Sequence, residues 1–405
     1  MKIWRWTATL LALAVCGSAC GTGAEASEVR GRVLDVPPGE ARPVIAGELR
    51  FGLRMLDAWC ARDPKANVVF SPSSLAGGLG MAALGAEGET AAEMAAVLGW
   101  PKDPLGGLKA RSDVLRGLKE VRTSDQVWAD EGLKAEQDYL DRVATGYGAG
   151  LKLLPLATDP EGSRKAVNDA ISDDTEGMIK DLLPEGALDG VGWVLTDAIH
   201  LKAEWAQEFE PDKTATGAFS TAAGGRADAE FMNGTGDFGY ARHGGWTGVR
   251  LPYAGGRLGM LALLPDGDGR ECPEIDAGTV ESFGSEAAGT RLEVSLPKVD
   301  LETGQEVGPL LQGLGMTTAF SDKADFTGIS PSTDRISAVR HAAKLRVDEK
   351  GTEAAAATSV EMEVKSSAPE ELPRVAFDRP YLLLLQDLST GEPLFLARVA
   401  DPSRK

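Results

Sequence analysis

The chain has 405 residues, of which 43% are hydrophobic and 25% charged, proportions that are ordinary for a globular protein with a large core. Its 42 basic and 61 acidic residues give a formal net charge of −19. Without a local basic patch, this charge excludes nucleic acid and other polyanions as expected partners.

The first 26 residues predict an export segment. Lys2 and Arg5 provide a positive start, TATLLALAV is an apolar stretch too short to span a bilayer, and small residues follow. The tetrapeptide GSAC is similar to a bacterial lipobox and favours a lipid-modified Cys20 as the mature N-terminus. Cleavage after AEA, before Ser27, stays open as the alternative. Both routes place the domain outside the cytoplasm, either secreted or held at the outer face of the cell membrane.

Two cysteines remain beyond the export segment. Cys60 falls on a helix that is predicted to be buried, and Cys272 falls in a predicted loop. An exported protein can hold a disulfide, but these unlike settings favour two separate thiols.

Residues 27–43 are expected to form an irregular linker, followed by one α+β domain over 44–405. Its early part is mainly helical, with an amphipathic helix, a short strand in NVVFSP, and an Ala- and Gly-rich helix. In the next helix, ETAAEMAAVLGW, Thr90 and Glu93 predict a capping box.

Strands dominate the later part of the chain. YLLLLQDLSTGEPLFLARV predicts a hairpin around Thr390 and Gly391. GTGDFG, at 234–239, matches G-x-G-x-x-G, but it neither follows a strong strand nor precedes a helix, so we expect a turn there.

Enzyme chemistry has little support in the sequence. The histidines are His200, His243 and His341, and G-x-S-x-G, H-E-x-x-H and paired C-x-x-C motifs are absent. We therefore expect no catalytic residue, no metal site and no cofactor.

The segment EKGTEAAAATSVEMEVKSS, residues 349–367, combines a helix-favouring composition with a strand-like pattern. Thr352, Ala354, Ala356 and Thr358 alternate with Glu353, Ala355 and Ala357, so that small side chains share one face of an extended chain. The pattern is longer than a typical strand and ends in the polar KSSAPEELP. It indicates an exposed loop that can become a strand, with an ordinary edge strand as the alternative.

Four blocks of the sequence, in the same order, resemble the serpin family. VDEKGTEAAAAT is similar to the hinge of inhibitory members, and NVVFSPSSLAGGLGMAALGAEGETAAEMAAVLG to the early helical block. TDAIHLKAEWAQEF is similar to the N-A-I-Y-F-K-G-x-W block, and FDRPYLLLLQDLSTGEPLFLARVADP to the C-terminal hairpin. The resemblance covers about residues 44–403. It implies three β-sheets, eight or nine helices and an exposed reactive loop at about 349–375.

The resemblance also implies a suicide-substrate inhibitor of serine proteases. The protease attacks the loop and forms an acyl bond, and the freed loop inserts as a new strand and distorts the protease. Small inward side chains would let the hinge enter between packed strands before deacylation. The hinge residues are Glu349, Gly351, Thr352, Glu353, Ala354, Ala355, Ala356, Ala357 and Thr358.

Two other functions stay open. A non-inhibitory serpin would act as a binding or carrier module, although a charged or bulky inward hinge would then be expected. Inhibition of a cysteine protease would use the same machinery. In either case the chain is expected to be a monomer, and to contact a membrane only through a lipid on Cys20.

The family's spacing implies the position of the cleaved bond. Counting from Glu349 as the first residue makes Lys365 the seventeenth and places the bond between Lys365 and Ser366. Lysine suits the acidic specificity pocket of a trypsin-like protease, the expected target. Glu363, Val364 and Ser366 stay open as baits through a shift of register. Because the loop is longer than usual after Lys365, Arg374 is a weaker alternative.

A further set of residues is implied to control strand opening. It consists of Ser71, Ser74, Asp197, His341, Lys298 and Trp205. Asp197 stands where the family usually has Asn, and could give His341 a charged partner. Lys298 is implied to pair with Glu349 near the insertion point.

Overall fold

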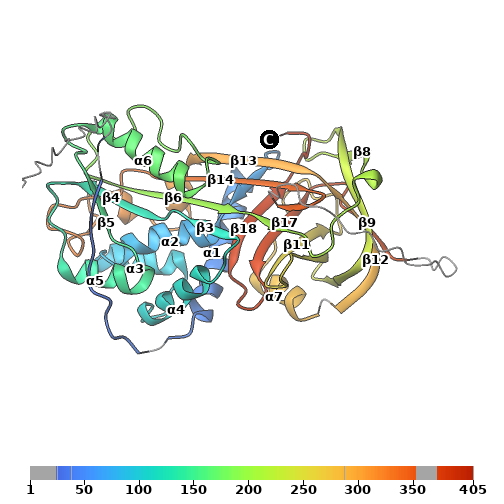
Figure 1. Cartoon of the computed structure of the whole chain (residues 1–405), viewed down its shortest axis with the longest axis horizontal. Helices are drawn as coiled ribbons and strands as arrows, with labels where there is room; N and C mark the ends of the chain where they lie inside the picture. Colours follow the sequence, from blue (N-terminus) through green and yellow to red (C-terminus); the bar gives the residue numbers. More distant parts are fainter. Residues whose placement is uncertain (1–23, 25, 38, 287, 353–371, 405) are drawn as a thin grey trace, which may run out of the picture.

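The computed structural model describes residues 24, 26–37, 39–286, 288–352 and 372–404 (Figure 1). This part of the chain contains eight α-helices and two short 3-10 helices. The α-helices are α1 (Arg42–Arg62), α2 (Pro72–Ala83), α3 (Gly88–Leu98), α4 (Leu105–Arg116), α5 (Gln137–Tyr147), α6 (Pro160–Asp174), α7 (Ala277–Glu286) and α8 (Gly308–Gly313).

The first β-sheet has nine strands, in the hydrogen-bonded order β1-β5-β4-β6-β14-β15-β7, with β3 also paired to β6 and β13 to β14. Figure 1 shows β6, β13 and β14 running along the long axis, with α2 on one face of the sheet and α6 on the other. The strands are β1 (Ser27–Val29), β3 (Val121–Thr123), β4 (Gln126–Asp130), β5 (Leu151–Leu154), β6 (Trp193–Leu201), β7 (Ala203–Glu204), β13 (Val299–Glu306), β14 (Val339–Asp348) and β15 (Gly351–Thr352).

The remaining nine strands form a second hydrogen-bonded network, in the order β16-β12-β9-β10-β11-β17-β18-β2, with β8 paired to β9. The described strands thus form two hydrogen-bonded networks where three sheets are expected, with the long strand β9 pairing with β8, β10 and β12 in the second network. The strands are β2 (Val68–Phe70), β8 (Ala215–Ser220), β9 (Arg226–His243), β10 (Trp246–Pro252), β11 (Leu258–Pro265), β12 (Ala288–Pro297), β16 (Arg374–Ala376), β17 (Tyr381–Asp387) and β18 (Pro393–Val399). The expected α+β class is confirmed.

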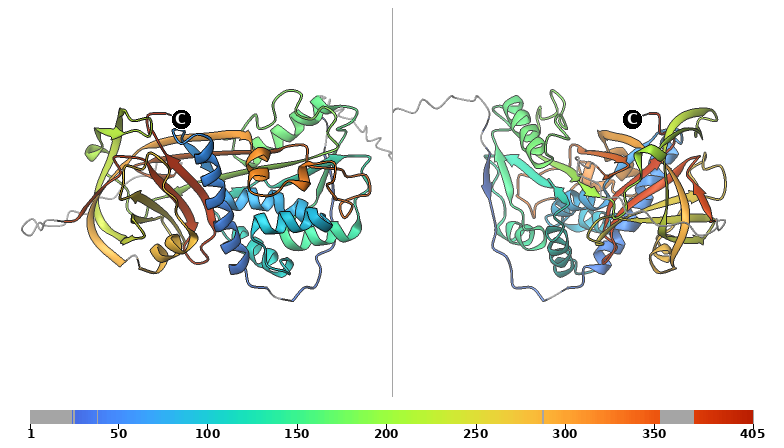
Figure 2. Two further views of the ribbon diagram at one scale, coloured as in Figure 1. Left: turned by 180° about the vertical axis from the view of Figure 1, so that it is seen from behind. Right: turned by 45° about the vertical axis from the view of Figure 1, so that its right-hand side comes forward.

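Three hydrophobic clusters hold these layers together. The first joins α1, α2, α3 and α5 to the first sheet, and the second lies between the two sheets. The third packs Val167 and Ile171 of α6 against Ala198 of β6 and Ala342 of β14. Seen from behind, α1 passes between the helical half and the second network (Figure 2). The opposite faces of β6 and β14 thus meet different clusters.

The segment before α1, expected to be an irregular linker, includes a strand and clamps one edge of the first sheet. β1 pairs antiparallel with β5. Farther along, the N–H of Arg32 donates to Asp141 Oδ1 (2.7 Å), and the N–H of Leu34 donates to Thr145 Oγ1 (2.8 Å), both on α5. A Cβ on Gly31 would lie 2.1 Å from the carbonyl carbon of Leu140, so the backbones touch. This segment, residues 27–34, follows the outer edge of the helical half (Figure 2).

A buried charge cluster ties α1 and α4 to the β17–β18 hairpin. Arg111 Nε lies 3.0 Å from Glu48 Oε1, and its Nη2 lies 2.9 Å from Glu392 Oε1. All three side chains are at most 2% exposed. Burial raises the pKa of Glu48 well above its usual value; Arg111 opposes this rise and Glu392 adds to it. One guanidinium therefore faces two buried carboxyl groups, and burial disfavours the charged form of Glu48.

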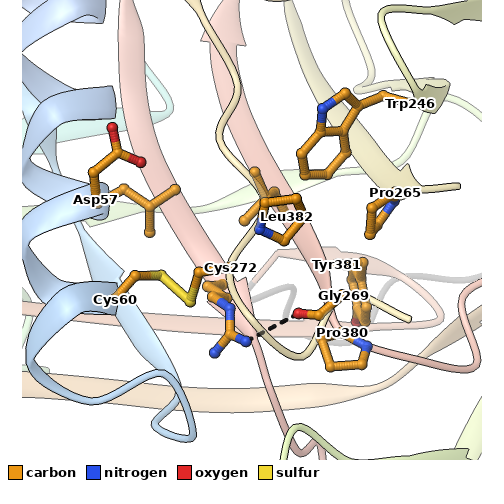
Figure 3. A pocket seen from close by; sticks show the side chains of 12 residues that line it. Asp57, Cys60, Trp246, Pro265, Gly269, Cys272, Pro380, Tyr381 and Leu382 are labelled. Carbon is orange, nitrogen blue, oxygen red and sulfur yellow. Dashed lines mark hydrogen bonds between the residues drawn. A yellow bond between two sulfur atoms is a disulfide. The ribbon is translucent and has the colours of Figure 1, made fainter. Parts of the chain in front are cut away.

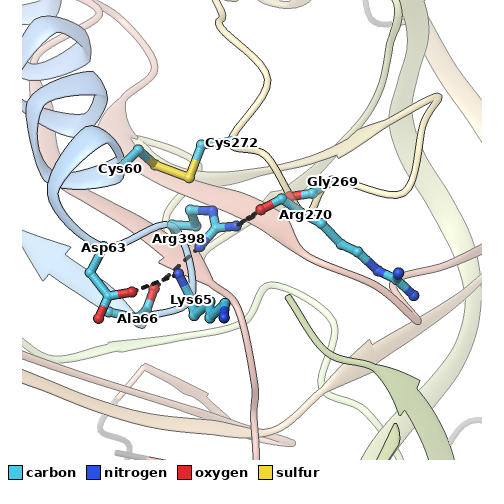
Figure 4. The surroundings of a disulfide bond; sticks show 8 residues. All are labelled: Cys60, Asp63, Lys65, Ala66, Gly269, Arg270, Cys272 and Arg398. Carbon is cyan, nitrogen blue, oxygen red and sulfur yellow. Dashed lines mark hydrogen bonds between the residues drawn. A yellow bond between two sulfur atoms is a disulfide. The ribbon is translucent and has the colours of Figure 1, made fainter. Parts of the chain in front are cut away.

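Cys60 and Cys272 form a disulfide, with Cα atoms 6.0 Å apart, so the expectation of two separate thiols is wrong (Figure 4). The loop between β11 and α7 folds back over the C-terminal end of α1. Arg398 holds it there by donating to the carbonyl oxygens of Gly269 and Arg270 at 3.2 and 3.3 Å. Sequence patterns place both cysteines correctly in a helix and a loop, but not these elements beside each other.

The disulfide also forms one wall of a small pocket (Figure 3). Trp246, Pro265 and Leu382 line other parts of it, so the pocket lies between α1 and the second network. Burial, together with the charge of Glu274, raises the pKa of Asp57 at its rim.

Thr90 and Glu93 do not form the predicted capping box, because α3 begins at Gly88 and both residues lie inside the helix. The Glu93 carboxylate instead accepts hydrogen bonds from the N–H groups of Thr317 and Thr318 at 2.8 and 2.7 Å. Glu93 thus binds the free N–H groups at the start of another helical turn rather than those at the start of α3.

GTGDFG lies within β9 rather than in the expected turn. A Cβ on Gly234 would lie 3.0 Å from the ring of Phe209, and one on Gly236 would lie 2.5 Å from Gln207 Oε1. The glycines allow the segment after β7 to approach this strand.

We expect Cys272→Ser to lower the free energy of unfolding by about 2–4 kcal/mol, because the disulfide restricts the unfolded chain. Urea unfolding with and without dithiothreitol measures this effect. The reductant should destabilise the parent and leave Cys272→Ser unchanged. Equal stability of the oxidised and reduced parent would contradict the expectation.

Candidate hinge and strand-opening site

The first residues of the hinge already form a strand within the first sheet. β15 lies between β14 and β7, and Thr352 is paired with Val347 on one side and with Ala203 on the other. Farther along the sheet, β6 and β14 pair directly and in parallel, at 195–199 and 339–343. β14 is thus paired directly with β6 along one stretch. Along another stretch, the hinge strand β15 lies between β14 and β7, the strand that follows β6 in the chain.

Gly351 is required by close approach. A Cβ at this position would lie 2.2 Å from the carbonyl oxygen of Ala203 and 2.8 Å from Cα of Glu204. Any other residue would push β15 away from β7, because the obstructing atoms belong to the backbone.

The predicted pair between Lys298 and Glu349 is present at the base of the hinge. Lys298 Nζ lies 3.3 Å from Glu349 Oε1, and Thr214 Oγ1 donates to the same oxygen at 2.8 Å. Burial alone would raise the pKa of Glu349, but the hydrogen bond from Thr214 and the ammonium group of Lys298 lower it overall. Glu349 is therefore bound both to Lys298, the residue between β12 and β13, and to Thr214, the residue directly before β8.

Trp205 holds the residues between β14 and β15. Its indole Nε1 donates to the carbonyl oxygen of Asp348 at 2.9 Å, and its backbone N–H donates to that of Lys350 at 2.8 Å. The indole stacks on Tyr253, with ring centroids 4.4 Å apart and planes inclined by 8°. Trp205 therefore lies beside the residues that connect β14 to β15, and its role in strand opening stays a prediction.

Tyr253 was not found by sequence reasoning, although it contacts the hinge directly. Its hydroxyl lies 2.6 Å from Thr352 Oγ1, and both side chains are buried. Its place at the end of the strand-like segment GVRLPYA gives no indication in the sequence that it contacts the hinge.

A chain of polar groups crosses beneath β6 and β14. The N–H of Ser71 donates to His341 Nε2 at 3.1 Å, Ser71 Oγ accepts from the N–H of Ser74 at 3.0 Å, and Ser74 Oγ donates to Asp125 Oδ1 at 2.7 Å. Ser71 is the N-cap of α2, with Pro72 in the first turn. The three predicted residues Ser71, Ser74 and His341 are brought together, while Asp125, which joins β3 to β4, was missed.

Nε2 of His341 is thus the acceptor at one end of this polar chain. Asp197 is paired with His341 in the β6–β14 register, so the two residues are neighbours across the strands that would part. The side chain of Asp197 is outside the described set, and its expected role as a charged partner stays a prediction.

The other predicted residues lie outside the described ranges. These are the lipidation residue Cys20, the hinge residues Glu353, Ala354, Ala355, Ala356, Ala357 and Thr358, and the reactive-bond residues Lys365 and Ser366. Arg374, the alternative bait, lies in β16, where it is paired with Glu293 of β12.

Within the described ranges, no group of three or more His, Cys, Asp and Glu side chains is arranged to hold a metal ion. None of the helices described is both long and apolar enough to cross a membrane.

Comparisons with known proteins identify related sequences over most of the chain. The family model for Serpin (serine protease inhibitor) matches residues 46–402. The chain is 32% identical over 347 residues to an uncharacterised serpin-like protein of Thermococcus kodakarensis, covering 83% of this chain and 81% of that protein. It is also 32% identical over 375 residues to serpin B8 of Homo sapiens, covering 87% and 97%.

A solved structure shares the fold. The crystal structure of tengpin, a thermophilic serpin in the native state, matches with a TM-score of 0.79 and 25% sequence identity. The match covers 93% of this chain and all of the tengpin chain.

We expect Glu349→Gln to be less stable than the parent at pH 7, by about 2 °C or less in Tm, because the carboxylate is partly exposed. The folded state lowers the pKa of Glu349, so its contribution exists above the ordinary Glu range and disappears as the pH falls through the lowered value. Thermal unfolding across this acidic range should show the two curves converging.

Glu230→Gln is the matched control. Glu230 Oε2 lies 3.7 Å from the same Lys298 Nζ, but its side chain is 66% exposed. This variant should match the parent. A gap between Glu349→Gln and the parent that persists at low pH would count against the electrostatic explanation.

Proposed function

Because this chain belongs to the serpin family of serine protease inhibitors, we propose that it inhibits a serine protease as a suicide substrate. The observation that carries this proposal is β15, since the first hinge residues already occupy the position of a strand between β14 and β7. Cleavage of the loop would let the chain extend this strand by parting β6 from β14.

The register of β15 defines the faces of the inserted strand. Thr352 is 2% exposed and points into the cluster between the sheets, opposite the buried Val347. If the same antiparallel register continues, Ala354 comes opposite Leu345, which is buried in that cluster, and Ala355 comes opposite Lys344. Small inward residues and polar outward residues therefore suit the inserted state.

Insertion would exchange the β6–β14 backbone hydrogen bonds for two new antiparallel ladders. Parallel pairing is slightly less stable per residue than antiparallel pairing, and the hinge adds a strand to the sheet. The polar chain through Ser71 and His341 would have to adjust as the strands separate, because it joins β14 to α2 and the β3–β4 segment. Opening is thus opposed until cleavage frees the loop.

We propose Lys365 as the bait residue, with cleavage before Ser366. The number of residues from the hinge base at Glu349 supports this position, and a lysine supports a trypsin-like target. Arg374 is disfavoured as a bait because its backbone is already paired in β16.

The chain is proposed to act as a monomer that forms a covalent acyl complex with its target. Cysteine protease inhibition and a non-inhibitory binding role are the alternatives. The small residues that follow Thr352 favour inhibition over the binding role, since an inserting strand needs an inward face without charge.

The experiment that tests this function uses the protein from Ser27 onward, incubated with trypsin, an elastase-like protease and a papain-like protease. A complex with trypsin that resists SDS, and a released peptide beginning at Ser366, are the expected results. Clean cleavage without a complex would support the non-inhibitory alternative. A complex with the papain-like enzyme alone would move the target class to cysteine proteases.

A pair of adjacent substitutions tests insertion itself. Ala354→Glu places a charge on the inward face, and we expect it to raise the stoichiometry of inhibition by about tenfold or more, since burying an unpaired carboxylate is costly. Ala355→Glu adds the same charge on the outward face beside Lys344 and should inhibit like the parent. Equal effects of both substitutions would contradict the proposed register.

We also propose that the chain is exported and carries a lipid on Cys20, with free secretion after cleavage before Ser27 as the alternative. Expression in a bacterial host with radiolabelled palmitate distinguishes the two. Label and membrane association should disappear in Cys20→Ala. An unlabelled protein in the medium would support secretion.

A further inference from the structure

Tyr253 reaches the hinge from the second network. It follows β10, forms a bridge with Trp205, and its N–H donates to the carbonyl oxygen of Leu258 at 3.0 Å. The ring is 1% exposed and stacks on Trp205, so its plane is fixed from one side. The hydroxyl therefore has a defined position before the hinge contacts it.

The partner of this hydroxyl is the first hinge side chain within the sheet. Tyr253 Oη and Thr352 Oγ1 are 2.6 Å apart, and Thr352 is 2% exposed. Withdrawal of the hinge would break this bond and leave the phenol hydroxyl in an apolar setting. Burial of a hydroxyl without a partner is unfavourable, so the pair resists withdrawal.

We propose that Tyr253 is a positioning residue that holds Thr352 in the sheet of the uncleaved protein and so sets the starting point of insertion. This inference rests on the proposed function for its kinetic consequence, but the hydrogen-bonded contact itself can be tested without a protease. Trp205 assists by fixing the Tyr253 ring and the carbonyl groups of Asp348 and Lys350.

Holding Thr352 has two opposing effects on inhibition. It shortens the part of the loop that a protease can reach, which slows the first encounter. It also spares the cleaved loop the step of entering the sheet, which favours trapping over release of the cleaved inhibitor. Loss of the contact should therefore raise the association rate constant and raise the stoichiometry of inhibition together.

Hydrogen exchange of the uncleaved protein tests the contact directly. In Tyr253→Phe, the peptide containing Gly351 and Thr352 should exchange about three- to tenfold faster than in the parent, which corresponds to the loss of one hydrogen bond. Unchanged exchange would overturn the proposal, whatever the protein inhibits. Tyr139→Phe is the matched control, because it removes a buried phenol hydroxyl from α5 for which no partner is found among the described residues.

Substitutions at Thr352 separate the hydrogen bond from packing. Thr352→Val keeps the branched shape and removes the hydroxyl, whereas Thr352→Ser keeps the hydroxyl. The peptide that contains position 352 should exchange as fast in Thr352→Val as in Tyr253→Phe, and at close to the parent rate in Thr352→Ser. The double variant that combines Tyr253→Phe with Thr352→Val should exchange little faster than either single variant. Additive effects would show that the two hydroxyls act independently and would overturn the proposal.

Inhibition kinetics then test the consequence. If the parent traps trypsin, Tyr253→Phe should raise both the association rate constant and the stoichiometry, while a general loss of stability would not raise the association rate. Faster exchange without these paired changes would overturn the kinetic role. If the parent traps no protease, the proposed function fails, and the exchange experiment still decides whether Tyr253 holds the hinge.

Discussion

The parallel pairing of β6 with β14 is the contact on which the arrangement of the first sheet depends. It spans only 195–199 and 339–343, and farther along β14 the strand formed by Gly351 and Thr352 lies between β14 and β7. β14 is therefore paired with β6 in one stretch and with β15 in another. The outer face of the paired region is covered by α6, and its inner face meets the polar chain that begins at His341. In the proposed mechanism, both α6 and the polar chain would have to shift for these strands to separate.

Two long-range connections lie away from the β6–β14 pairing. The Arg111 cluster fixes α1 and α4 to the β17–β18 hairpin, and the Cys60–Cys272 disulfide fixes the other end of α1 to the loop after β11. Neither joins β6 to β14. In the proposed mechanism, the helical half and the second network would stay anchored by these connections while β6 and β14 part. Tyr253 follows β10 of the second network and contacts Thr352 of the hinge, so in the proposed mechanism it would connect the anchored elements to the moving one.

Local sequence patterns predicted the elements better than the contacts between them. The α1 helix and the β17–β18 hairpin follow from hydrophobic periodicity and from the turn residues Thr390 and Gly391. The Lys298–Glu349 pair and the Ser71–Ser74–His341 cluster were identified through family resemblance, because nothing in their spacing indicates that they meet. The disulfide and the role of Glu93 were predicted wrongly, since both depend on where a distant loop or turn is placed. Tyr253 and Asp125 were missed for the same reason: their neighbours are 99 and 51 residues away in the sequence.

The segment before α1 has a consequence for association between molecules. Without β1, the edge of β5 would present unpaired backbone groups, which can pair with a strand from another chain. β1 covers this edge with a strand of only three residues, and Glu28 and Arg30, whose side chains form an ion pair, place charges there. Because β1 is short and carries these charges, it offers a strand from another molecule few backbone groups with which to pair. If the central sheet accepts an additional strand as proposed, the N-terminal segment would keep a strand from pairing at this other edge instead.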